Sequence, residues 1–264
     1  MRKMVSSVIS ALLFLSIGSG VALAQEEESE EPNVVPVETF TCDFNEGKGP
    51  GDLQKVIDDW NDFMDDKGVD YYFAATLTPY YFGELAFDIG WLGVWTDGGK
   101  MGAGTDMWLD EGGELDAQFS EVLNCKSHTN FVSMNVKRRP QNEEESDDSD
   151  KSFVIAFSNC SMQEGKTFDD YLAAQEMWNA YADEHGFSDN VYAMFPIFGE
   201  TDDSYDFKSV GTSDDHTAFG NDYKLMSEGH WRKSSELFDD LLDCDSARVY
   251  NATVVREMTA EEED

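Results

Sequence analysis

The amino-acid sequence predicts an α+β fold in which one β-α-β-β-α-β unit occurs twice in tandem. The first observation is a repeat at an offset of 118 residues, which places CDFNEGK, beginning at Cys42, on CSMQEGK, beginning at Cys160. Nine of the 29 gapless positions from 42 to 70 are identical to their counterparts. The second observation is that both copies alternate strand-like and helix-like apolar spacing in the same order. A period this long indicates a duplicated domain and not a short solenoid repeat.

The elements of the first copy follow from the spacing of apolar residues. Residues 38–44 read as a strand, and an apolar stripe from Leu53 to Met64 predicts a helix that starts near Asp52 and stops near Gly68. Two strands, a second helix and a last strand are expected at residues 71–78, 85–95, 115–123 and 129–137. This order is the ferredoxin-like plan. We therefore expect two ferredoxin-like units that form an intramolecular pseudo-dimer.

Acidic segments separate and flank the two copies. The stretch between them contains six acids and, apart from one proline, no apolar residue, which is typical of a solvated linker. The predicted organisation is a signal peptide at 1–24, an acidic tail at 25–37, the first unit at 38–138, a linker at 139–152, the second unit at 153–258 and an acidic tail at 259–264.

The first 24 residues have the pattern of a secretory signal peptide. Arg2 and Lys3 precede an apolar run from Val5 to Ile17, and a small-residue cleavage pattern ends at Ala24. The run is shorter than the roughly 20 residues that a membrane-spanning helix needs. We therefore expect an exported bacterial protein, periplasmic or extracellular, with no membrane insertion after the signal is removed.

The chain is strongly acidic, with a formal net charge of −37. Residues 1–24 hold two basic residues and no acid, so the remainder has 16 basic against 55 acidic residues, a net charge of −39. Such a surface repels phosphate backbones and anionic lipids, and we expect neither nucleic acid nor a membrane surface as partner. The Asp-x-Asp-x-Asp-Gly spacing of a calcium loop does not occur, and no metal site is predicted. Serine-hydrolase, zinc-protease and dinucleotide motifs are absent as well.

The four cysteines fit the duplicated plan as two structural disulfides. In this plan the fourth strand lies antiparallel beside the first, so their ends meet and predict the pairs Cys42–Cys125 and Cys160–Cys244. An exported location permits oxidation. Closing a loop of roughly 84 residues should stabilise the fold by about 4–5 kcal/mol in the chain-entropy model. A redox-active pair would need Cys-x-x-Cys, which is absent.

The duplicated unit with its aromatic-rich strands resembles the dimeric α+β barrel superfamily, which includes the antibiotic-biosynthesis-monooxygenase-like proteins. The resemblance covers about 200 residues and rests on element order and duplication. It implies two units packed sheet against sheet, with pockets between sheet and helices. It also implies a choice among cofactor-free oxygenases, haem-degrading enzymes, chlorite-dismutating enzymes and proteins without known activity.

Haem-handling members of this superfamily use an axial histidine. The chain has four histidines, and none has a counterpart in the other copy: they are His128, His185, His216 and His230. We therefore expect no cofactor.

One group of polar residues recurs in the segment that connects the first strand of each copy to the first helix. Glu46 and Lys48 recur as Glu164 and Lys166, and they could bind a carboxylate ligand or share a proton. The alternative is a turn with Gly47 at a positive φ and an exposed ion pair.

Two further sets are candidates for chemistry. Asp88 recurs as Asp206 in an otherwise apolar strand, where a carboxylate could act as a catalytic base or could bind backbone groups at a strand end. Trp91 and Trp95 share one face of a strand and correspond to serines in the second copy. They could line a cavity for an apolar or aromatic ligand, or fill a bulkier core.

We therefore expect an exported protein that binds a small apolar or aromatic ligand or a protein partner on a duplicated α+β barrel, as a monomer. One alternative is a cofactor-independent monooxygenase-like enzyme, which leaves open whether the protein is an enzyme. Another is a structural acidic envelope protein.

The cysteine pairing predicts a mass difference. The protein purified from its own host should gain four hydrogens on reduction, because each of two disulfides takes up two. Intact-mass spectrometry before and after reduction measures this, and peptide mapping should recover Cys42 linked to Cys125. An unchanged mass would contradict the pairing.

Overall fold

The computed structural model describes residues 34–84, 86–137 and 152–258. The predicted signal peptide, most of the N-terminal acidic tail, the linker and the C-terminal tail lie outside these ranges. In the described part of the chain no helix is long and apolar enough to cross a membrane.

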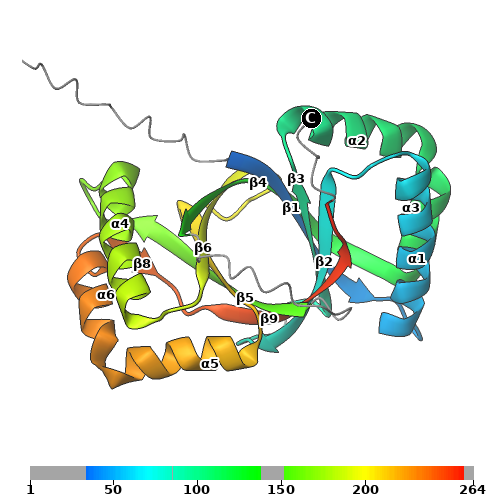
Figure 1. Cartoon of the computed structure of the whole chain (residues 1–264). Helices are drawn as coiled ribbons and strands as arrows, with labels where there is room; N and C mark the ends of the chain where they lie inside the picture. The colour runs from blue at the N-terminus through cyan, green and yellow to red at the C-terminus, as the bar shows by residue number, and fades with distance from the viewer. Residues whose placement is uncertain (1–33, 85, 138–151, 259–264) are drawn as a thin grey trace, which may run out of the picture. The chain divides into compact units, whose positions relative to one another are not determined.

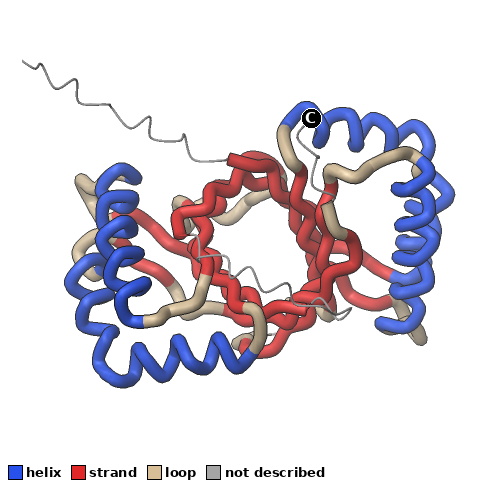
Figure 2. The backbone as a smooth tube through the Cα atoms, in the orientation of Figure 1, coloured by secondary structure: helices blue, strands red, loops and turns tan. Residues whose placement is uncertain are grey.

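Eight antiparallel strands close into a barrel, with the helices outside it (Figures 1 and 2). The order around the barrel is β7-β6-β4-β1-β3-β2-β9-β5, and β5 pairs back onto β7. The strands are β1 (Val34–Phe44), β2 (Tyr72–Tyr81), β3 (Ile89–Trp95), β4 (Leu123–Lys137), β5 (Ser152–Met162), β6 (Asn190–Phe198), β7 (Phe207–Ser213) and β9 (Arg248–Arg256). A short strand, β8 (Leu242–Cys244), pairs with the end of β5. The predicted α+β class is confirmed.

Helices cover the barrel in two groups (Figure 1). The first half of the described chain, β1 to β4, carries α1 (Pro50–Asp66), α2 (Gly98–Glu111) and α3 (Gly113–Val122). The second half, β5 to β9, carries α4 (Phe168–His185), α5 (His216–Leu225), the π-helical turn η1 (Met226–His230) and α6 (Trp231–Phe238).

The first helices of the two halves begin in different ways, and the one with a predicted start, near Asp52, begins two residues earlier. Helix α1 starts at Pro50, with Asp52 inside its first turn, because proline at the first helical position needs no hydrogen-bond acceptor. Helix α4 starts after Thr167, whose hydroxyl accepts from the Asp170 backbone amide while the Asp170 carboxylate accepts from the Thr167 amide. Gly68 and Gly186 follow α1 and α4 at φ 65° and 80°, which agrees with the helix end predicted near Gly68.

Helix α2 was not predicted. Its glycines lower helix propensity, which masked the pattern. Asp97 caps the helix by accepting from the Lys100 backbone amide at 2.8 Å. Gly104 lets the helix approach the sheet closely, because a Cβ there would lie 2.5 Å from the Trp95 ring. A helix with little propensity therefore forms because it covers a bulky strand residue.

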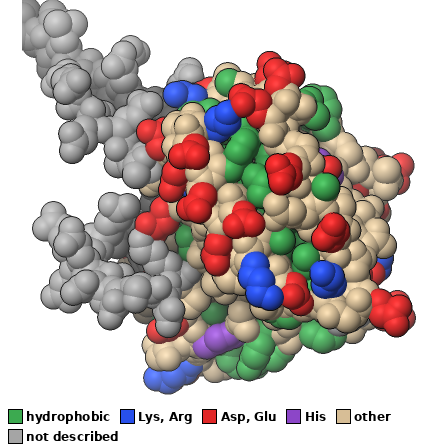
Figure 3. All heavy atoms as spheres, turned by 90° about the vertical axis from the view of Figure 1, so that its right-hand side faces the viewer, with side chains coloured by type: hydrophobic (Ala, Val, Ile, Leu, Met, Phe, Trp, Pro, Cys, Tyr) green, Lys and Arg blue, Asp and Glu red, His purple; other side chains and the backbone are tan. Residues whose placement is uncertain are grey.

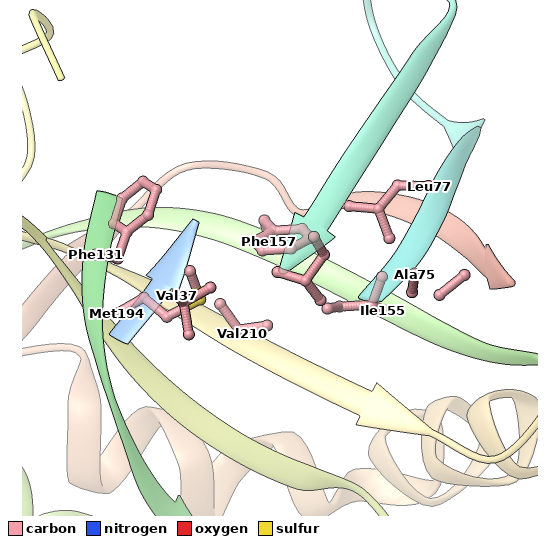
Figure 4. Packing of buried hydrophobic residues seen from close by; sticks show 10 residues of the cluster. Val37, Ala75, Leu77, Phe131, Ile155, Phe157, Met194 and Val210 are labelled. Carbon is pink, nitrogen blue, oxygen red and sulfur yellow. The ribbon is translucent and has the colours of Figure 1, made fainter. Parts of the chain in front are cut away.

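The barrel interior is a packed core (Figure 4). Alternate residues of the strands point inward and bury their side chains against one another. The buried set is Val37, Ala75, Leu77, Leu92, Phe131, Ile155, Phe157, Met194, Val210 and Ala252. Because one face of every strand is used for this core, any ligand pocket must lie on the other face, between sheet and helices.

Both predicted cysteine pairs lie at disulfide distance. In the antiparallel registers, Cys42 faces Cys125 and Cys160 faces Cys244. The sulfur atoms are 1.99 Å apart in the first pair and 2.05 Å apart in the second.

The last strand of each half is anchored against the other half. Strand β4 pairs with β6, and β9 pairs with β2. The Asn61 side chain of α1 donates to the Val255 carbonyl of β9 at 2.8 Å, and the Asn179 side chain of α4 donates to the Val136 carbonyl of β4 at 2.7 Å. Beside the second contact, Lys137 is fully buried, with Nζ 2.6 Å from Asp189 Oδ1.

Acidic side chains spread over the helical surfaces. The exposed side of α1 carries Asp58, Asp59, Asp62 and Asp66. Figure 3, which views the side of α1 to α3, shows acidic side chains outnumbering basic ones.

The buried ion pair predicts an asymmetric stability effect. Asp189→Asn should lower the free energy of unfolding by about 3 kcal/mol, because it leaves the Lys137 ammonium buried without its paired charge. Lys137→Met should cost less, since Asp189 is 28% exposed and can be solvated. Urea unfolding measures both. The exposed Lys55→Met, with its lysine 77% exposed, is the control and should change stability little. Equal losses in the two core variants would contradict the argument.

Candidate functional site

The tryptophans of β3 are packed inside the first half. Trp91 is half-buried and meets the Trp60 ring at 5.2 Å and the Phe119 ring at 6.2 Å, both edge-on. Its Nε1 donates to the Tyr72 hydroxyl at 3.1 Å. Trp95 is buried, 4.2 Å from the Tyr72 ring. Trp91 and Trp95 therefore belong to a continuous aromatic cluster between the sheet and its helices.

A polar chain starts from the same tyrosine. The Tyr72 hydroxyl donates to Glu38 Oε1 at 2.7 Å, and His128 Nε2 lies 2.9 Å from Glu38 Oε2. Burial, with the nearby Glu38 carboxylate, raises the pKa of Tyr72 well above its ordinary value. Gly93 makes room for this hydroxyl, because a Cβ there would lie 1.9 Å from it. These hydrogen bonds satisfy the polar groups of Trp91, Tyr72 and Glu38 next to the aromatic cluster.

A pocket of about 600 Å³ lies in the second half, beneath α4 and α6 and against β7 and β8. Ser209 stands there at the position that Trp91 holds in the first half. The pocket is lined by Gln163, Tyr171, Gln175, Ser209, Ser234, Phe238, Asp239, Leu242, Asp243 and Cys244. The indole of Trp91 fills this layer in the first half, whereas the small side chain of Ser209 leaves the equivalent space open in the second half.

Two polar side chains of α4 lie deep in this pocket. Tyr171 is 2% exposed and Gln175 is 4% exposed. Gln175 Nε2 donates to Asn179 Oδ1 at 2.8 Å, which leaves its carbonyl oxygen for another donor. Within the described residues the Tyr171 hydroxyl has no hydrogen-bond partner, and its oxygen keeps some accessible surface at the wall of the pocket. Burial raises the pKa of Tyr171, so the group remains a neutral phenol that can donate and accept.

Two carboxylates lie at the opening of the pocket. Asp239 follows α6 and Asp243 lies on β8, and both residues are exposed. In the described ranges no Lys or Arg lies within 4 Å of either carboxylate. Cys244, which also lines the pocket, ties β8 to β5 through its bond to Cys160. The disulfide therefore holds one wall in place.

The two halves differ systematically at the positions that line the pocket. At an offset of 118 or 119, four polar lining residues of the second half have apolar counterparts in the first, and both lining acids have uncharged ones, while Gln163 corresponds to another amide, Asn45. The pairs that differ are Tyr171 and Leu53, Gln175 and Ile57, Ser209 and Trp91, Ser234 and Leu115, Asp239 and Ser120, and Asp243 and Asn124. The same scaffold thus has a closed apolar interior on one side and an open polar pocket on the other.

The duplicated aspartates bind backbone groups. Asp88 Oδ2 accepts from the Phe44 amide at 3.0 Å, and Asp206 Oδ2 accepts from the Met162 amide at 2.7 Å. Their own amides donate to the Cys42 and Cys160 carbonyls. This is the strand-end alternative considered for them, and neither lines the pocket.

The duplicated Glu-Gly-Lys segments form tight turns. Gly47 and Gly165 have φ of 76° and 79°, a region that favours glycine. The Lys48 amide donates to the Asn45 carbonyl, and the Lys166 amide donates to the Gln163 carbonyl. Glu46, Lys48, Glu164 and Lys166 are exposed, and none of them lines the pocket.

The pocket does not fit a haem. Each histidine is engaged elsewhere: His128 with Glu38, His185 and His230 with Tyr181, and His216 with Asn251. Cys244 is in a disulfide, and the raised pKa of Tyr171 opposes its use as a phenolate ligand. The aspartates at the opening would repel haem propionates. Among the described residues, no group of three or more His, Cys, Asp or Glu could hold a metal ion.

The deep pocket residues were missed at the sequence level. The exchange of Trp91 for Ser209 is visible in the sequence, but it was interpreted only for the first half, as a tryptophan-lined cavity or a bulkier core. The exchanges of Leu53 for Tyr171 and Ile57 for Gln175 were the available signal, since both put polar groups on an apolar helical stripe.

No family model matches the chain, and no curated protein matches it. Solved structures with the same fold include a provisionally assigned chlorite dismutase, at 11% identity and a TM-score of 0.50 over 83% of this chain and 94% of the other. An anthrone oxidase-like protein matches at 10% identity and 0.50 over 89% and 96%. A provisionally assigned monooxygenase from Lactobacillus acidophilus NCFM matches at 11% and 0.50 over 85% and 95%. At these identities the likeness shows the fold alone.

The aromatic cluster predicts that Trp91 supports stability. Trp91→Ala should lower the free energy of unfolding by about 3 kcal/mol, because it empties the space beneath α1 and α3. Chemical denaturation with far-ultraviolet circular dichroism measures this. The exposed Trp231→Ala serves as the control and should change stability by less than about 1 kcal/mol. If Trp91→Ala leaves the free energy of unfolding unchanged, the prediction that Trp91 supports stability is wrong.

Proposed function

We propose that this protein is an exported binding protein whose small ligand sits in the pocket beneath α4 and α6. One observation carries the proposal: the Tyr171 side chain, 2% exposed and without a hydrogen-bond partner among the described residues, lines the pocket that Ser209 leaves open. A ligand that enters the pocket can hydrogen-bond this hydroxyl, which can both donate and accept.

The ligand we propose is polar. The tryptophans that suggested an apolar or aromatic molecule are packed in the first half, whereas the pocket presents hydroxyl, amide and carboxylate groups. Phe238 and Leu242 supply its apolar surface. A cavity of this volume holds a metabolite-sized molecule.

We further propose that the two halves are duplicated units, at 38–138 and 153–258, that form a pseudo-dimer within one chain. The reciprocal contacts of Asn61 and Asn179 support this, as do the matching roles of Asp88 and Asp206. On this proposal the first copy contributes a closed apolar core beneath its helices, whereas the second copy has the accessible pocket. Export would supply the oxidising conditions for both cysteine pairs.

Native mass spectrometry tests the binding proposal. The protein purified from its own host should show excess mass that disappears on denaturation. Ser209→Trp should remove this excess mass, because an indole would occupy the pocket as Trp91 occupies the first half. Ser152→Trp, at the exposed start of β5, adds the same group elsewhere and should keep the ligand. Excess mass retained by Ser209→Trp, or none in the unmodified protein, would overturn the proposal.

A further inference from the structure

We infer that the pocket selects an organic ammonium ion that also carries hydroxyl or amide groups. This inference rests on the proposed binding function and adds the chemical class of the ligand. It follows from which groups line the pocket, where each lies, and how they differ from the first half.

The positive end of the ligand is assigned to the opening of the pocket. Asp239 and Asp243 line it without a Lys or Arg within 4 Å in the described residues. The lining includes two carboxylates and no basic side chain. An ammonium group can donate to both carboxylates, whereas an anionic ligand would meet like charge on entry.

The comparison of the halves makes these carboxylates specific to the pocket. Asp239 and Asp243 correspond to Ser120 and Asn124, which are uncharged. In a chain with 55 acidic residues, an acid at a given position carries little information by itself. Here both acids appear together with the opened cavity, at the positions that line it.

The polar end of the ligand is assigned to the base of the pocket. The Tyr171 hydroxyl can donate and accept, and the Gln175 carbonyl can accept. Both side chains are more than nine-tenths buried, so a ligand that reaches them leaves water. A ligand with a hydroxyl or amide group opposite its ammonium group would satisfy both ends, and the ring of Phe238 can contact the carbon atoms between them.

The overall negative charge of the protein attracts any cation, so the test must separate local from general attraction. Isothermal titration calorimetry should compare three charged probes with neutral counterparts of similar shape: ethanolamine with 1-propanol, choline with 3,3-dimethyl-1-butanol, and glucosamine with glucose. At least one ammonium probe should bind about tenfold or more tightly than its neutral counterpart.

A pair of double variants with equal charge change provides the control. Asp239→Asn with Asp243→Asn should weaken binding of that ammonium probe by about tenfold or more and remove the preference over the neutral probe. Asp59→Asn with Asp62→Asn removes two exposed acids of α1 and should leave the affinity within about twofold. Equal losses in both double variants would show general attraction and overturn the inference.

The remaining outcomes separate this inference from the proposed function. Equal binding of neutral and charged probes, both abolished by Ser209→Trp, would overturn the ammonium preference and leave the pocket as a binding site. Ammonium binding that persists in Ser209→Trp would overturn both. If no probe binds, or if the molecule that copurifies with the protein is an anion, the ammonium inference fails.

Discussion

The pairing of the last strand of each half with a strand of the other half is the constraint on which the rest of this structure depends. Strand β4 lies between β1 of its own half and β6, and β9 lies between β5 of its own half and β2. These pairings close the sheet, so that the barrel has no exposed hydrogen-bonding edge along its eight strands. Asn61 and Asn179 reinforce this pairing by donating to the backbone of the last strand of the other half. The residue pair Trp-Asn, which recurs in the sequence, thus serves packing through its tryptophan and contact between the halves through its asparagine.

Closure decides where a ligand can bind. The inward residues of all eight strands form one apolar core, which leaves only the outer face for a pocket. On that face each half must cover its sheet with helices, and the volume of the side chains between them determines whether a cavity remains. In the first half Trp91, Trp60 and Phe119 occupy this layer. In the second half Ser209 leaves it open, and Tyr171 and Gln175 make it polar.

The two halves also differ in how the polar side chains beneath their helices are satisfied. The Tyr171 hydroxyl in the second half has no hydrogen-bond partner among the described residues and lies at the wall of the pocket. The cysteine pair of that half joins β8 to β5 at the wall of the pocket, so it keeps the cavity in shape while constraining the unfolded chain. In the first half the aromatic cluster fills the corresponding layer, and the side chains of Glu38, Tyr72 and Trp91 are hydrogen-bonded to one another.

The sequence by itself determined the class of fold, the order of most elements, both cysteine pairs and the glycine turns, because these depend on local periodicity, on turn chemistry and on a visible repeat. It did not reveal α2, whose glycines hide a helix that forms against Trp95. It placed Trp91 correctly on one face of a strand but could not decide whether that face lined a cavity or filled one. Only the tertiary structure decided this, since the answer depends on what α1 and α3 bring to the same space. The surroundings of Tyr171 and Gln175 were likewise decided by packing, because a polar residue on a helical stripe lines a pocket only where the opposite wall leaves room.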